Sequence, residues 1–124
     1  MNYNDLLGVK FTVHGRNKED GFDCYGLAIE VLKRNGIVLK DVFYEKLENE
    51  NEIRKNAFLN TKTKRIGYLK KNCIILLTVN GEPNHIAVYI GDGFIIHATK
   101  TNGVVIQPIH IWKKRIEGIY EICN

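Results

Sequence analysis

Three residues of this chain carry side chains that could together perform acyl chemistry: Cys24, His85 and His97. A cysteine attacks a carbonyl carbon as its thiolate, which an adjacent base must generate, and the same base can return the proton to the leaving amine. A third group that holds the imidazole ring completes such a set. We therefore predict that Cys24 is a nucleophile, that His85 is its base and that His97 holds His85 in place.

The position of Cys24 supports this hypothesis. A cysteine in the first turn of a helix lies among backbone N–H groups that favour an anion, can lower the pKa of a thiol and can bind an oxyanion. Gly26 follows two residues later, and a glycine in a first turn usually marks the close approach of a substrate or of another backbone segment. The alternative is that Cys24 is a core residue, because free cysteines are often buried.

The helix that would position Cys24 is the clearest one in the sequence, and it runs from Cys24 to about Arg34. Asp23 before it is a suitable N-cap, and Asn35 and Gly36 after it form a natural C-terminal stop. Its apolar residues recur with the spacing of a single helical face: Cys24, Leu27, Ala28, Val31 and Leu32. A weaker, charged helical pattern covers residues 44–59.

After residue 71 the sequence changes to β-branched runs separated by turn signals, which favours an antiparallel sheet. Helices followed by strands are typical of the α+β class. The strands are predicted at residues 73–79, 86–90, 94–98, 104–106 and 116–122, and the turns at Asn80-Gly81, Gly91-Asp92-Gly93 and Asn102-Gly103.

The two histidines must share a face of this sheet. A three-residue loop at 91–93 would pair Ile90 with Phe94 and place Ala87 opposite His97. Because side chains alternate along a strand, His85 would then be a diagonal neighbour of His97, at about 7–8 Å between backbone positions. A two-residue loop would instead put the two histidines on opposite faces.

Other uses of these residue types remain open. Each histidine could be structural. A zinc site could use Cys24, Cys73, His85 and His97, but no two of them have the short spacing of zinc ligands. The catalytic set needs no cofactor and no metal. His14 precedes the segment of Cys24 and could approach the same cleft.

Length and composition limit the alternatives. A chain of 124 residues with 44% hydrophobic content suits a single domain spanning 1–124. The net charge of +4 favours an anionic partner, but the basic residues are scattered and do not indicate a specific nucleic-acid site. The three cysteines are too few and too widely spaced for a disulfide framework. No apolar run reaches the length of a membrane span, and the polar N-terminus does not resemble a secretory signal.

The chain resembles the NlpC-type cysteine peptidases, papain-like enzymes that cut peptide stems of the bacterial cell wall. The resemblance runs from about Gly8 to the C-terminus and rests on three motifs: Gly21-Phe-Asp-Cys-Tyr-Gly-Leu27, Asn84-His-Ile-Ala-Val-Tyr-Ile-Gly-Asp-Gly93 and Ile95-Ile-His-Ala98. It implies N-terminal helices packed on a C-terminal antiparallel sheet of about five strands. It also implies the roles already given to Cys24, His85 and His97, with Asp23 and Tyr25 beside the substrate cleft.

Departures from the family pattern bear on the substrate. Tyr25 stands where the family commonly has serine, and in this it is similar to the branch found in phage tail assembly proteins. Phe11 takes the place of an upstream tyrosine near the cleft. Asn72-Cys73 replaces a Gly-Asp pair before the first core strand, and we predict that Cys73 is a core residue. Phe11, His14, Asp23 and Tyr25 are accordingly the candidate substrate-binding residues.

The resemblance implies an endopeptidase that hydrolyses peptide or isopeptide bonds in peptidoglycan stems through a thioester acyl-enzyme. Two alternatives use the same fold: a phage tail assembly or structural module with weak or no catalysis, whose partners would be phage tail proteins, and an acyltransferase or amidase. Without a secretory signal, the expected location is the cytoplasm or a phage tail, with secretion only by a non-classical route or within a larger parent protein.

Overall fold

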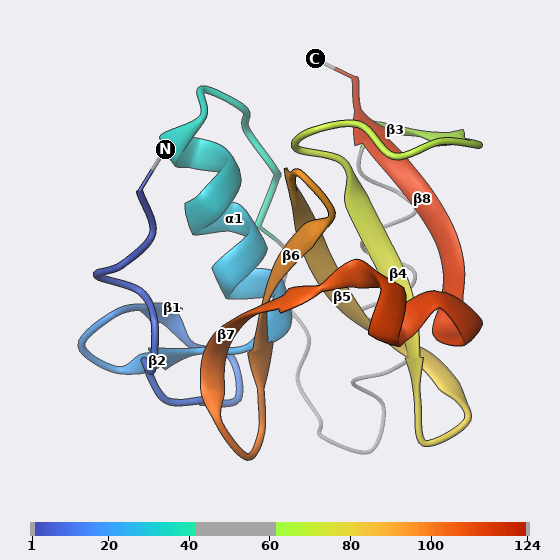
Figure 1. The fold of residues 1–124 in the computed structure, drawn as a ribbon. Coiled ribbons are helices and arrows are strands. Elements are labelled where there is room, and N and C mark those ends of the chain that lie inside the picture. The colour runs from blue at the N-terminus through green and yellow to red at the C-terminus, as the bar shows by residue number, and fades with distance from the viewer. Residues whose placement is uncertain (1, 42–61, 124) are drawn as a thin grey trace.

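A computed structural model of the chain describes residues 2–41 and 62–123 (Figure 1). The helix predicted over residues 44–59 lies outside these ranges. Within them the molecule has one α-helix, a six-stranded antiparallel sheet, a two-stranded hairpin and a 3₁₀ helix. The order of helix and strands agrees with the predicted α+β class, although the sheet has one strand more than the five expected. None of the helices in the described ranges is long and apolar enough to cross a bilayer.

Helix α1 (Cys24–Arg34) begins and ends where its sequence predicts. The carboxylate of Asp23 caps it by accepting a hydrogen bond of 2.7 Å from the backbone N–H of Gly26. Asn35 is its C-cap, and Gly36 follows with a φ of 78°, which a glycine adopts without strain. The cap and the stop therefore fix the helix through contacts that are local in sequence.

The strands follow the order β3-β8-β4-β5-β6-β7 across the large sheet, with every neighbouring pair antiparallel. Strand β3 is the one that the sequence pattern did not predict. The elements are the hairpin β1 (Arg16–Asn17) and β2 (Gly21–Phe22), then β3 (Thr63–Ile66), β4 (Ile74–Val79), β5 (Glu82–Gly91), β6 (Phe94–Thr99), β7 (Gly103–Pro108), the 3₁₀ helix η2 (Ile109–Arg115) and β8 (Ile116–Ile122).

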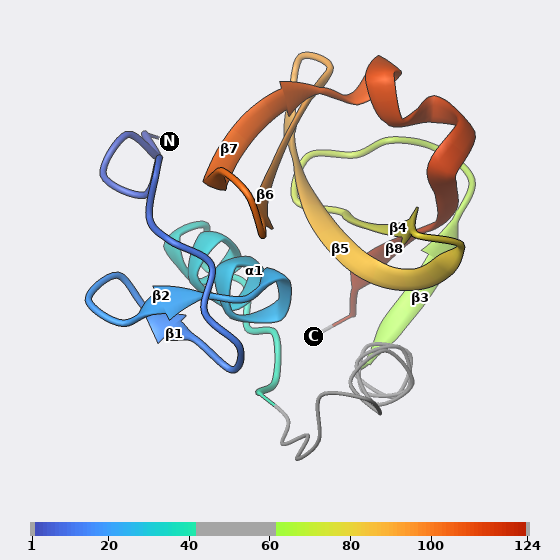
Figure 2. The same cartoon turned by 90° about the horizontal axis from the view of Figure 1, so that it is seen from below.

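The sheet is curled, and Figure 2 shows α1 on its outer side and η2 joining β7 to β8 across the opening. The outer cluster of buried residues packs α1 against the sheet and includes Leu27, Val31, Ile74, Leu76, Ile86, Val88, Ile96 and Ala98. The inner cluster contains Cys73, Ile75, Leu77, Ala87 and Ile95, with Tyr89, Ile109 and Trp112 packed on it. Alternation along β5 and β6 thus separates two apolar clusters, and Cys73 is a core residue as predicted.

The loop between β5 and β6 differs from the prediction. Gly91, not Ile90, pairs with Phe94, so the loop has two residues, Asp92 and Gly93, with φ of 55° and 86°. Positive φ at both positions is the requirement of the tight turn that matches strand twist. A register shift between Tyr89 and Gly91 adds one residue to β5 and restores the predicted register further along, where Val88 pairs with Ile96.

The segment before α1 runs beside β7 and leads to Phe11. The backbone N–H of Gly8 donates to the carbonyl of Val104 at 2.9 Å, and the N–H of Val104 donates to the carbonyl of Val9 at 2.9 Å. A side chain at Gly103 would clash with the carbonyl oxygen of Val9. Glycine is therefore required where the N-terminal segment meets the β6–β7 turn.

Candidate functional site

A chain of hydrogen bonds links four side chains from four elements of the inner side. His85 Nε2 of β5 lies 2.7 Å from His97 Nδ1 of β6. His97 Nε2 lies 2.7 Å from Oε1 of Gln107, at the end of β7. The indole N–H of Trp112 in η2 donates to the same oxygen at 3.0 Å. The two histidines therefore share a face and are bonded directly, as the sequence predicts.

Aromatic packing surrounds this chain. The rings of His85 and His97 meet edge to face with centroids 5.0 Å apart, and the indole of Trp112 meets His97 in the same way at 5.2 Å. Trp112 also stacks on His85 with centroids 6.2 Å apart. The guanidinium of Arg115 covers the Trp112 ring at 4.1 Å from its centroid. These contacts restrict the rings, since aromatic pairs prefer such geometries.

His97 is buried, with 1% of its surface exposed. Burial lowers the pKa of His97 below its ordinary value because an imidazolium loses its hydration there, and the hydrogen bond to Gln107 opposes this only in part. His97 is therefore neutral at physiological pH. A neutral imidazole has one donor and one acceptor nitrogen, so it can accept a hydrogen bond from one partner while donating to the other.

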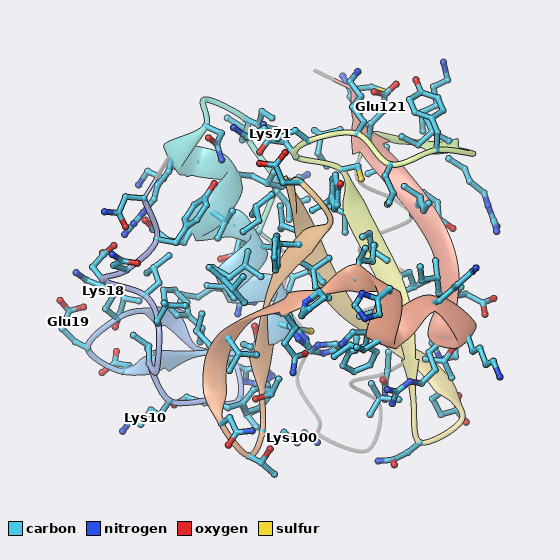
Figure 3. All side chains as sticks on the ribbon, viewed as in Figure 1. Lys10, Lys18, Glu19, Lys71, Lys100 and Glu121 are labelled. Atoms are coloured by element: carbon cyan, nitrogen blue, oxygen red, sulfur yellow. The ribbon has the colours of Figure 1, made fainter. Side chains whose placement is uncertain are left out.

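A pocket of about 350 Å³ opens beside His85. Its lining includes His85, Phe11, Asn84, Lys100 and Trp112. Among the described residues that line the pocket, only Lys100 is a lysine, arginine, aspartate or glutamate. The ammonium of Lys100 lies 6.0 Å from the centroid of the Phe11 ring. Figure 3 shows Lys100 at the β6–β7 turn, at the opposite end of the sheet from Lys71 and Glu121. The pocket thus combines an aromatic wall, polar groups and one positive charge.

Cys24 is the first residue of α1, and 1% of its surface is exposed. It belongs to the outer apolar cluster together with Ile86 and Ala98, which follow His85 and His97 directly in sequence. Helix α1 lies against both histidine strands, β5 and β6 (Figure 1). The fold therefore brings the start of the helix to the strands that carry the histidines.

The carboxylate of Asp23 organises the start of this helix. Besides the N–H of Gly26, it accepts hydrogen bonds from Arg16 Nη1 at 2.8 Å and from the backbone N–H of His14 at 3.2 Å. A side chain at Gly26 would clash with the carbonyl oxygen of Gly15. The close approach that Gly26 predicts is thus made by the protein's own backbone.

The predicted substrate-binding residues fall into two groups. Phe11 lines the pocket beside His85, and His14 is exposed next to the Asp23 cap, with a φ of 61°. Asp23 and Tyr25 are fully buried, and the Tyr25 hydroxyl donates to the carbonyl of Lys40 at 2.6 Å. Burial and internal hydrogen bonds favour a structural role for both, and their contact with a substrate stays a prediction.

Sequence reasoning missed Gln107 and Trp112. Gln107 is a diagonal neighbour of His97 on the same face because of the β6–β7 register, in which His97 pairs with Val105 and Ile95 with Gln107. The predicted turn at Asn102-Gly103 does not give this register: Gly103 pairs with Thr99 and begins β7, whereas a two-residue turn at 102–103 would place Gln107 on the opposite face. No periodicity placed Trp112, because η2 crosses from the edge strand β7 to β8, which lies between β3 and β4 on the other side of the curled sheet.

The residues weighed for zinc do not gather around a common point. No group of three or more histidine, cysteine, aspartate or glutamate side chains suited to hold a metal ion occurs in residues 2–41 and 62–123. Cys24 and Cys73 belong to the outer and inner apolar clusters respectively, and burial raises the pKa of the Cys73 thiol.

Comparison with known proteins identifies relatives over nearly the whole chain. The NlpC/P60 family pattern matches residues 8–121. The murein DD-endopeptidase MepS/murein LD-carboxypeptidase of Escherichia coli (strain K12) is 26% identical over 116 residues, covering 91% of this chain and 55% of that protein. The gamma-DL-glutamyl hydrolase of Bacillus subtilis (strain 168) is 29% identical over 102 residues, which are 82% of this chain and 23% of that protein. The chain thus spans about half the length of the first of these relatives.

Solved structures share the fold. The NlpC/p60 domain of the peptidoglycan hydrolase SagA superposes with a TM-score of 0.64 at 17% identity, covering 96% of this chain and 92% of that one. A protein of the NLP/P60 family from Staphylococcus aureus superposes with a TM-score of 0.68 at 20% identity, covering 96% of this chain and 38% of that one. At this level of identity the likeness concerns the fold alone.

Proposed function

Because the chain belongs to the NlpC/P60 family, we propose that it hydrolyses an amide bond in the peptide stems of bacterial peptidoglycan, with Cys24 as the nucleophile. The observation that carries the proposal is the 2.7 Å contact between His85 and His97 at the edge of a pocket. A half-buried imidazole bonded to a second, neutral imidazole is suited to accept and return a proton. The relatives named for murein or glutamyl hydrolysis support the choice of substrate.

In the first half of the reaction, His85 takes the thiol proton of Cys24 as the sulfur attacks the carbonyl carbon of the scissile amide. The carbonyl oxygen gains the negative charge of the tetrahedral intermediate. Collapse of this intermediate breaks the C–N bond, and the imidazolium of His85 donates its proton to the departing amine. A thioester between Cys24 and the acyl part of the substrate remains.

In the second half, His85 takes a proton from a water molecule that attacks the thioester carbonyl. Cleavage of the C–S bond releases a carboxylic acid, and the proton returns to the sulfur of Cys24. His97 remains neutral throughout and orients the ring of His85. The first turn of α1 contributes its N-terminal dipole to both oxyanions, while its Gly26 N–H is already bonded to Asp23.

The pocket offers a place for the substrate beside His85. Phe11 and Trp112 present apolar surface to a peptide, and Asn84 presents an amide. Lys100 supplies a positive charge, which suits a peptide that bears a carboxylate.

Purified peptidoglycan treated with the wild-type chain and with Cys24→Ala tests the proposal, with the released peptides identified by mass. We expect peptide release by the wild type and none by Cys24→Ala. Cys123→Ser is the matched control, because Cys123 is an exposed cysteine, and it should retain full activity. Undiminished hydrolysis by Cys24→Ala would disprove the mechanism. The same assay with an amine added to the reaction tests for acyl transfer. Products in which the amine is joined to the released peptide would indicate acyl transfer instead of hydrolysis.

A second candidate function is a binding module that keeps the fold without catalysis, as in the phage tail assembly alternative. The burial of Cys24 favours it, since a nucleophile must reach its substrate. Alkylation by iodoacetamide at neutral pH separates the two functions, because an activated thiolate reacts faster than an ordinary thiol. Labelling of Cys24 faster than that of exposed Cys123 supports the enzyme; labelling slower than that of Cys123 supports the binding module.

A further inference from the structure

We propose that Gln107 and Trp112 are positioning residues that fix the tautomers of both histidines, so that His85 presents Nδ1 as the basic atom of the site. The catalytic consequence of this inference rests on the proposed function. The tautomers themselves are properties of the folded protein, and they can be observed without any substrate.

The indole N–H of Trp112 can only donate a hydrogen bond. The group that faces it at 3.0 Å must therefore be the carbonyl oxygen of the Gln107 amide. With the amide turned around, its NH₂ group would face the indole N–H, and two donors would oppose each other in a partly buried place. Trp112 thus selects the orientation of the Gln107 side chain.

The orientation of Gln107 then decides the tautomer of His97. The same carbonyl oxygen lies 2.7 Å from His97 Nε2. An amide oxygen accepts and never donates, so the proton of this bond belongs to Nε2 of His97. Since buried His97 is neutral, its other nitrogen, Nδ1, carries a lone pair.

The tautomer of His97 decides that of His85 in the same way. His97 Nδ1 lies 2.7 Å from His85 Nε2 and can only accept there. The proton of this bond therefore belongs to Nε2 of His85, which leaves Nδ1 as the basic nitrogen when His85 is neutral. When Nδ1 takes a proton, the Nε2–H bond to His97 is kept and strengthens, because its donor has become charged.

The hydrogen bonds from Trp112 through Gln107 and His97 consequently prepare His85 to accept a proton at Nδ1. Without these bonds, a neutral imidazole would distribute its proton between two tautomers, and only one of them has a lone pair on Nδ1. The four residues come from β5, β6, β7 and η2, so the tautomer of the base depends on how these elements pack together.

Nitrogen NMR on the Cys24→Ala variant of the whole 124-residue chain tests the tautomers directly. With ¹⁵N-labelled histidine, two-bond couplings to the ring protons distinguish Nε2–H from Nδ1–H and from imidazolium. We expect both His85 and His97 as Nε2–H at neutral pH. An Nδ1–H tautomer or an imidazolium at His97 would overturn the inference. If instead Cys24→Ala hydrolyses peptidoglycan normally, the proposed function fails while the tautomers stand.

Trp112→Phe tests whether the indole N–H acts through Gln107, because phenylalanine keeps an aromatic ring at this position and removes the donor. We expect kcat to fall about 10-fold with little change in KM, and the Nδ1–H tautomer of His97 to appear in the spectrum, since outer partners of functional histidines have effects of this order. An unchanged spectrum would overturn the inference.

Gln107→Met completes a double-mutant cycle with Trp112→Phe. Methionine has a similar length but no carbonyl oxygen, so we expect kcat to fall about 10–100-fold. If Trp112 acts only by orienting Gln107, adding Trp112→Phe to Gln107→Met should lower kcat no further. Two fully additive losses would overturn the proposed order of action. Variants are compared only after circular dichroism shows that each is folded.

Discussion

The candidate site has two halves, which are held in place by different means. One is the start of α1, and the other is the hydrogen-bonded series of His85, His97, Gln107 and Trp112, here called the histidine chain. At the helix start a carboxylate, Asp23, is buried and meets a guanidinium and two backbone N–H groups within residues 14–26. In the histidine chain four side chains, none of them a carboxylate, bond in series. Contacts that are local in sequence and include an ion pair fix the helix start with the proposed nucleophile. Contacts between separate strands and η2 fix the proposed base.

This difference suits the chemistry proposed for each half. A nucleophile at a helix start needs a rigid backbone, and a buried carboxylate with several donors provides it, because removing any partner leaves a costly buried charge. A base must change its charge during the reaction, and neutral neighbours can polarise toward it without competing for the proton. We therefore expect substitutions at the helix start to lower stability and those in the histidine chain to lower activity.

The largest expected effect is on activity at His85. His85→Ala should lower peptide release from peptidoglycan by about 10²–10⁴-fold, the contribution of a general acid–base, with a small change in the thermal midpoint because His85 is only partly buried. His110→Ala is the matched control, since His110 is exposed on η2, and it should keep full activity. Retained activity in His85→Ala would contradict its role as the base.

The largest expected effect on stability is at Gly26. Gly26→Ala should lower the free energy of unfolding by about 1–3 kcal/mol, because the new methyl group clashes with the backbone carbonyl of Gly15. Urea unfolding gives the measurement. Gly67→Ala is the control, because a Cβ there meets nothing within 4 Å, and it should be neutral or slightly stabilising. Equal stability of the two variants would show that the approach of Gly15 relaxes freely.

Loss of the helix cap should have a smaller effect. Asp23→Ala should lower the free energy of unfolding by about 1–2 kcal/mol, because it removes an N-cap and a partner of Arg16. Asp41→Ala removes the other carboxylate that bonds Arg16, at 3.0 Å, but Asp41 has 59% of its side chain exposed. We expect at most about 0.5 kcal/mol there. A larger loss for Asp41→Ala would reverse the contrast between the two partners.

The smallest expected effect is a pH dependence of stability from His97. Its pKa is lowered by burial, so below its ordinary value of 6.5 the unfolded chain binds a proton that the folded chain does not. Stability is therefore full above about pH 6.5 and falls as the pH drops, by less than about 1.4 kcal/mol per pH unit. Urea unfolding between pH 7 and 5.5 measures it. The slope should decrease in His97→Gln; an unchanged slope would contradict a neutral His97.

The hairpin of β5 and β6 shows how far sequence reasoning reaches. Alternation along the strands predicted a shared face for His85 and His97, and this is confirmed by their hydrogen bond. The predicted three-residue loop was wrong, because Asp92 and Gly93 form a two-residue turn and a bulge near Tyr89 supplies the extra residue. The shorter turn and the bulge compensate each other, because the two-residue turn without the bulge would have shifted the pairing by one residue and put His85 and His97 on opposite faces.

By itself the sequence determined what depends on neighbours along the chain. The Asp23 cap, the stop at Gly36 and the alternation that carries His85 and His97 all follow from hydrogen bonds and steric limits within a few residues. Only the tertiary structure decided the rest: the burial of Tyr25, the carbonyl of Gly15 against Gly26, and the bonds of Gln107 and Trp112 to His97. The reason is physical, because these contacts join segments whose distance and orientation are set by the curl of the sheet and the packing of α1, which no local pattern encodes.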